Sequence, residues 1–147
     1  MNRIELLKRN NLYWVKSQDI EFADISYPRL NIGELVAKEF TRNPPGKHVS
    51  LDIDAYLRST LRHCLSSQDV SPKGVVLDNL GILLEPDLEL NPVKLFLELS
   101  IDSVVILIWD YAILDGTRFV WDEANPDYGF VFPSQTITNL ELPNEVS

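Results

Sequence analysis

Apolar residues along this chain follow two spacings, one typical of strands and one typical of helices. Strands are predicted where short runs combine aromatic, β-branched and aliphatic residues. The clearest runs are LYWVK at 12–16, GVVLD at 74–78 and SVVILIWD at 103–110. GVVLD is apolar up to its final acid, a pattern typical of a central strand in a parallel sheet whose two faces are both covered.

Helices are predicted where apolar residues recur three or four positions apart. One helix starts after Asn31, a second starts after Ser50 as its expected cap, and Asn91 followed by Pro92 is a favourable start for a third. The apolar face of the first helix comprises Ile32, Leu35, Val36 and Phe40, and that of the second comprises Ile53, Leu57, Leu61 and Leu65. Weaker strand candidates follow toward the C-terminus, at TRFVW, GFVF and TITNLEL.

Strands that alternate with helices predict an α/β fold, a three-layer sandwich with a mainly parallel central sheet. The chain has 147 residues, of which 45% are hydrophobic. This length and composition suit a single globular domain that covers residues 1–147.

The charge and cysteine content limit the classes of partner. The formal net charge is -9, from 22 acidic and 13 basic residues, and such a surface repels phosphates. Non-specific nucleic-acid binding is therefore not expected. Cys64 is the only cysteine, which suits a reducing cytoplasm. The sequence shows no signal-peptide pattern and no apolar run that spans a bilayer, so we predict a cytoplasmic protein without a membrane partner.

The acids that end two of the predicted strands match functional positions of an additional-strand P-loop ATPase. In such an enzyme an acid at the end of an apolar strand holds Mg²⁺. A polar residue at the end of the next strand senses the γ-phosphate. Asp78 takes the first position, and Trp109 or Asp110 takes the second. Asn79 stands where a catalytic glutamate is common, and its amide cannot take a proton from water.

The phosphate-binding loop of these enzymes, G-x-x-x-x-G-K-[ST], is absent from the sequence. The nearest match, PPGKHVS at 44–50, lacks the first glycine and has His48 in place of the serine or threonine. Between the first predicted strand and Ile32 there is no glycine, although a backbone cradle for phosphates needs one. We therefore expect a P-loop-NTPase-like fold without the phosphate-binding loop, and no ATP hydrolysis.

Residues 30–130 resemble the small P-loop-type protein encoded in BREX phage-defence systems. The resemblance lies in LNIGELVAKEF, VVLDNLGILLEPDLELNPVKLFLELS, VVILIWD and NPDYGFVFP. That family is expected to carry a nucleotide-binding loop near its N-terminus, and this chain departs from it there. The resemblance implies a degenerate relative from a defence or restriction cluster that is kept for its shape and its contacts.

The expected function is that of a structural or regulatory subunit that binds proteins and uses no cofactor. Its partners would be other proteins of a defence complex or further copies of the chain. Trp121 is the best candidate for an exposed aromatic anchor. The leucine-rich segment LLEPDLELNPVKLFLEL has more apolar residues than one core face needs. The predicted partner-binding residues are Trp121, Tyr128, Phe96 and Leu88.

Two further hypotheses differ in class. The first is a metal-dependent nuclease or phosphohydrolase that uses Asp78 and Asp110, with Mg²⁺ bound at Asp78. The acids of the C-terminal stretch would contribute, although their spacing matches no nuclease motif; they are Asp115, Asp122, Glu123 and Asp127. The second is a nucleic-acid mimic, which would bind a basic partner with an affinity that falls with salt. Its acids are scattered rather than evenly spaced.

Overall fold

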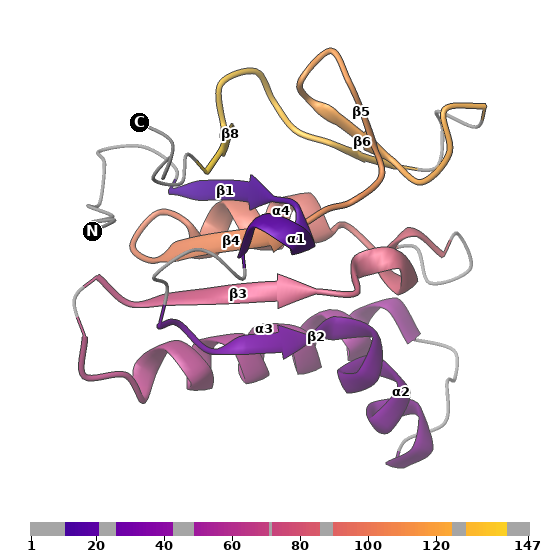
Figure 1. Ribbon diagram of the computed structural model, residues 1–147. Coiled ribbons are helices and arrows are strands. Elements are labelled where there is room, and N and C mark those ends of the chain that lie inside the picture. Colours follow the sequence, from indigo (N-terminus) through magenta and orange to yellow (C-terminus); the bar gives the residue numbers. More distant parts are fainter. Residues whose placement is uncertain are drawn as a thin grey trace.

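The computed structural model shows two β-sheets with helices packed mainly on one side of the larger sheet (Figure 1). The described residues are 11–20, 26–42, 49–70, 72–85, 90–124 and 129–140. The larger sheet has five strands in the order β2-β3-β4-β1-β8, and all neighbouring strands are parallel. These strands are β1 (Leu12–Val15), β2 (Arg29–Asn31), β3 (Gly74–Asp78), β4 (Val104–Ile108) and β8 (Ile137–Asn139). The prediction of an α/β fold with a mainly parallel central sheet is confirmed.

The smaller sheet is antiparallel and follows β4 in the chain. Its strands, in spatial order, are β5 (Ala112–Leu114), β6 (Arg118–Val120) and β7 (Gly129–Val131). Asp115 and Gly116 both have positive φ, at 54° and 72°, and the Thr117 amide donates to the Leu114 carbonyl at 3.2 Å. This is the Asp-Gly turn that favours a tight hairpin. The predicted positions of β6, β7 and β8 are confirmed, whereas β5 was not anticipated.

Three helices of eight or more residues are described, together with two shorter ones. The longer ones are α2 (Ile32–Arg42), α3 (Val49–Ser66) and α4 (Pro92–Leu99), and the shorter ones are α1 (Ser17–Ile20) and the 3-10 helix η1 (Leu80–Leu84). Asn91 caps α4, because its Oδ1 accepts from the Lys94 amide at 3.3 Å and Pro92 follows at the first helical position. α3 begins at Val49, so Ser50 lies inside the helix instead of preceding it.

The two faces of the larger sheet have different covers. The face toward α2, α3 and α4 carries alternate residues of β3 and β4, namely Val75, Leu77, Val105 and Leu107. The opposite face carries Val76, Val104, Ile106 and Ile108. In the described part of the chain, α1 is the one helix on that opposite face, where Ile20 packs against the cluster. Of the predicted three layers, the described residues show the sheet and one layer with the three longer helices, while the other face carries α1.

An ion-pair cluster joins α3 to α4 at the surface. The Arg58 guanidinium donates from Nε to Asp54 at 2.7 Å and from Nη1 to Glu98 Oε2. The hydrogen bond from Arg58 lowers the pKa of the Glu98 carboxyl below its usual value. Both partners of Arg58 are partly exposed, so the cluster contributes little to the free energy of unfolding.

Aromatic side chains hold the smaller sheet against the larger one. Trp109, directly after β4, is 2% exposed and packs against Phe119 and Phe130, with ring centroids 6.2 and 5.5 Å away. Phe96 of α4 packs edge-on against Phe130 at 6.2 Å and is 1% exposed. The prediction that Phe96 contacts a partner is wrong, because its ring is buried inside this aromatic core.

None of the helices in the described ranges is both long enough and apolar enough to cross a bilayer. The longest of them, α3, is amphipathic: Leu61 is 0% exposed on its buried face, and Leu51 is 68% exposed on its outer face.

These two leucines of α3 provide a matched test of the packing. We expect Leu61→Ala to lower the free energy of unfolding by about 2–5 kcal/mol, because it leaves a cavity in the core. Leu51→Ala should change it by less than about 0.5 kcal/mol, because the side chain is in water in both states. Urea denaturation followed by circular dichroism measures both. Equal losses in the two variants would show that α3 packs by another face.

Candidate functional site

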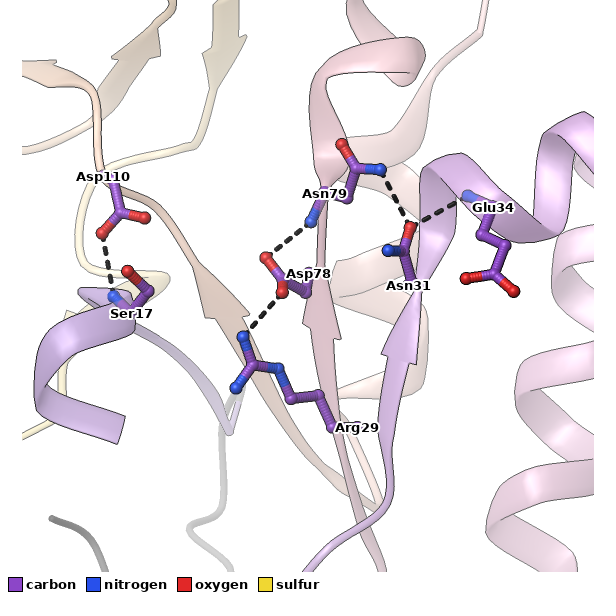
Figure 2. A network of polar contacts seen from close by, with 7 residues as sticks. All are labelled: Ser17, Arg29, Asn31, Glu34, Asp78, Asn79 and Asp110. Carbon is purple, nitrogen blue, oxygen red and sulfur yellow. Dashed lines mark hydrogen bonds and ion pairs between the residues drawn. The ribbon is translucent and has the colours of Figure 1, made fainter. Parts of the chain in front are cut away.

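The carboxyl ends of the parallel strands form the edge at which a site is expected. In open α/β sheets, ligands bind at this edge, where the chain leaves two adjacent strands in opposite directions. β1 and β4 are such a pair: from β1 the chain continues to β2, at one edge of the sheet, and from β4 it continues to β8, at the other. We therefore take the carboxyl ends of β1, β4 and the neighbouring β3 as the candidate site (Figure 2).

Asp110 lies beyond the end of β4 and holds the start of α1. The Ser17 amide donates to Asp110 Oδ1 at 2.8 Å. The strand register brings the two together, since Val15 pairs with Ile108 and each partner lies two residues further on. The first amides of a helix have no partner within the helix and carry partial positive charge. The carboxylate of Asp110 thus satisfies a donor that would otherwise face solvent or a ligand. Trp109, the other predicted candidate here, points into the core instead.

Asp78, at the end of β3, has a donor on each carboxylate oxygen. Oδ2 accepts from Arg29 Nη2 at 2.7 Å, and Oδ1 accepts from the Asn79 amide at 2.7 Å. Arg29 comes from β2, the strand beside β3. A metal ion at Asp78 would share the carboxylate with the Arg29 guanidinium, and a single carboxylate with no further ligands binds Mg²⁺ weakly.

Asn79 connects the end of β3 to the start of α2. Its backbone is left-handed, with φ 55°, and its Nδ2 donates to Asn31 Oδ1 at 2.9 Å. The same oxygen accepts from the Glu34 amide at 2.9 Å, which confirms Asn31 as the cap of α2. The Gly33 amide donates to the Asn79 carbonyl at 3.0 Å, and a Cβ on Gly33 would lie 2.4 Å from Asn79 Nδ2. Where an ATPase often has a catalytic glutamate, this chain therefore has a residue that positions α2.

The two aspartates of the alternative enzyme hypothesis belong to neighbouring strands but point to different partners. Figure 2 shows Asp110 directed toward Ser17 and Asp78 directed toward Arg29. Within the described ranges, no group of three or more histidine, cysteine, aspartate or glutamate side chains is arranged to hold a metal. Asp115 lies in the β5–β6 turn. The geometry therefore offers neither a second carboxylate for an ion at Asp78 nor a free one at Asp110.

Other predicted residues lie apart from this edge or outside the description. Asp122 and Glu123 are exposed after β6, and Cys64 is half-buried on α3. His48, Leu88, Asp127 and Tyr128 lie outside the described residues. Sequence reasoning missed Ser17 and Arg29, because neither belongs to a motif and each meets its aspartate only through strand pairing.

A pair of stacked aromatic rings lies beside the candidate site. Tyr111 and Trp121 have ring centroids 4.7 Å apart and an interplanar angle of 14°. Their side chains are 49% and 47% exposed, so the predicted exposure of Trp121 is confirmed. Trp121 also lies against η1, since a Cβ on Gly81 would be 1.9 Å from its ring. We call Tyr111 and Trp121 the aromatic pair.

Comparison with protein-family models, with curated proteins and with solved structures found no match to this chain. Any assignment of function therefore depends on the site geometry together with the sequence pattern.

The left-handed backbone of Asn79 allows a test of how the end of β3 is held. Asn79→Ala and Asn79→Gly both lose the hydrogen bond to Asn31. Only alanine adds the steric cost of a left-handed backbone in an L-residue. We therefore expect the free energy of unfolding of Asn79→Ala to be lower than that of Asn79→Gly by about 1 kcal/mol. Urea denaturation measures the difference.

Asn139 in β8 is the control, because its φ is not positive. There the glycine variant should be the less stable of the two, since glycine weakens a strand. The same order at both positions would contradict the described conformation of Asn79.

Proposed function

We propose that this chain is a non-catalytic, P-loop-like protein that acts by binding other proteins, as a structural or regulatory subunit of a bacterial antiviral defence complex. The observation that carries the proposal is the hydrogen bond from the Ser17 amide to the Asp110 carboxylate. Phosphate sites use backbone amides at a helix start just after a strand. In this chain the Asp110 carboxylate accepts the hydrogen bond from such an amide, that of Ser17.

The strand order supports the P-loop-like part of the proposal. In additional-strand P-loop ATPases, one strand separates the strand that leads into the phosphate loop from the strand that ends in the metal-binding acid. Here β4 lies between β1 and β3, and β3 ends in Asp78. The same order places Asp110 between the ends of the other two strands.

The local chemistry supports a role without nucleotide. α1 has four residues and starts two positions after β1, with no glycine between them. Asp78 and Asp110 place carboxylates at the edge where phosphates would bind, and like charges repel each other at short range. The nearby Arg29 is paired with Asp78. A nucleotide would therefore meet two carboxylates and no prearranged cradle.

The place in a defence complex follows from the resemblance of residues 30–130 to the small P-loop-type protein of BREX systems. In such a complex a subunit without catalytic groups contributes surfaces. We infer that its partners are proteins of that complex or further copies of the chain, in the cytoplasm, with no cofactor involved.

Nucleotide binding is tested by thermal melting with increasing Mg-ATP. We expect no saturable rise in the melting temperature. A ligand present at 100 times its dissociation constant stabilises the folded state by about 2.7 kcal/mol, so a real site would be visible. The variant Asp110→Asn tests whether the charge of Asp110 excludes nucleotide, because it keeps an oxygen acceptor for the Ser17 amide and removes the charge. A saturable rise with the unaltered chain would overturn the proposal.

Nuclease activity is tested by incubating plasmid DNA with the chain and Mg²⁺ or Mn²⁺. We expect no cleavage, because Asp78 is paired with Arg29 and the described residues contain no group of three side chains arranged to hold a metal. Cleavage that is lost in Asp78→Ala and kept in Asp69→Ala would favour a metal-dependent nuclease instead. Asp69 is an exposed acid beyond the end of α3 and serves as the matched control. Circular dichroism of both variants checks their folding.

A further inference from the structure

We propose that the aromatic pair and the carboxylates around it form a docking surface for a lysine- and arginine-rich segment of a partner protein. This inference rests on the proposed function of protein binding and specifies the partner's chemistry. Tyr111 and Trp121 are the only large aromatic residues exposed in the described part of the chain. Tyrosine and tryptophan are the residues most enriched at the energetic centres of protein interfaces.

The hairpin register creates the pair. Ala112 pairs with Val120, so the next positions outward, Tyr111 and Trp121, lie opposite each other. Cross-strand aromatic neighbours of this kind stack. The two rings lie nearly parallel at 4.7 Å, so their facing sides cover each other while about half of each residue stays exposed.

The pair is held in place from both ends. Tyr111 packs edge-on against the buried Trp109 at 5.3 Å. Trp121 rests on η1, where Gly81 leaves room for its ring. Rings that are already fixed lose little freedom when a partner binds, so more of the contact energy appears as affinity.

The charge around the pair indicates what kind of partner fits. Three exposed acids adjoin the pair in the chain: Asp110 precedes Tyr111, and Asp122 and Glu123 follow Trp121. Guanidinium and ammonium groups stack on the faces of tryptophan and tyrosine, and they pair with carboxylates. A basic segment is therefore complementary to both features of the surface.

The same charges disfavour the other occupants. A second copy of the chain would bring an acidic surface against an acidic surface, within proteins of net charge -9 each. Nucleic acid would be repelled for the same reason. The surface also adjoins the candidate site. Tyr111 directly follows Asp110, and the Trp121 ring packs against η1, the helix that follows β3. A partner bound there would cover the edge at which open α/β sheets bind their ligands.

The test uses the full chain and a fluorescently labelled peptide of alternating arginine and glycine. Fluorescence anisotropy should show saturable binding that weakens as salt is raised. The double variant Asp122→Asn/Glu123→Gln should weaken it about fivefold or more, because two attractive charges at the surface are removed. Tyr111→Ala should weaken it by about threefold or more through lost stacking.

The matched control is Asp52→Asn/Asp69→Asn, which removes the same charge from exposed positions on α3 and just beyond it. It should bind the peptide as the unaltered chain does. Equal weakening by the control, an unchanged affinity in Tyr111→Ala, or no saturable binding would each overturn the inference.

A second measurement does not depend on the stability of any variant. In an NMR titration the peptide should shift the Trp121 indole N–H resonance and leave that of Trp14, on β1, in place. A shift of the Trp121 resonance with chain concentration alone would mean that a second copy occupies the surface, and a shift with a single-stranded oligonucleotide would mean nucleic acid. Either result overturns the inference. Mg-ATP stabilisation would overturn the proposed function but not this result, so the two failures are distinguishable.

Discussion

The pairing of β4 (Val104–Ile108) between β1 and β3 is the interaction on which the rest of the structure depends. Every side chain of β4 is at most 4% exposed, and its backbone is bonded to a parallel strand on each side. Burial of both faces ties the register of this strand to the packing of two hydrophobic clusters at once. A shift of one residue would move each side chain to the opposite face.

That register determines the chemistry at the carboxyl edge. It brings Asp110 to the start of α1, while the neighbouring pair of β2 and β3 brings Arg29 to Asp78. The edge where α/β proteins usually bind small ligands is thus occupied by contacts within the chain itself. Internal pairing of this kind holds the ends of the strands in place.

The exposed aromatic pair lies further out, on the hairpin that follows β4. Buried aromatic rings around Trp109 anchor that hairpin, and the same series of rings continues outward to Tyr111 and Trp121. The aromatic core of the small sheet and the exposed aromatic pair are therefore parts of one continuous stack. A substitution within the buried rings is expected to disturb the surface as well, because Tyr111 packs on Trp109.

Much of the fold could be predicted from local patterns. The bounds of β3, the apolar face of α3 and the start of α4 at Asn91 and Pro92 all follow from spacing and capping chemistry within short segments. The short strands β2 and β5 were missed, because three residues show no reliable alternation. Phe96 was misassigned to the surface. Its helix is apolar around most of its circumference, and only the position of β7 shows that this side is covered.

The sequence by itself determined that Asp78 and Asp110 follow apolar runs and that no glycine-rich phosphate loop precedes Ile32. These features are local, since they depend on the order of neighbouring residues. The tertiary structure alone decided which donors bind the two carboxylates. Arg29 is 49 residues from Asp78 and Ser17 is 93 residues from Asp110, so each contact exists only because strands distant in sequence pair in one register. The electrostatics of the edge depend on those contacts, because a carboxylate's behaviour depends on the groups that surround it in space.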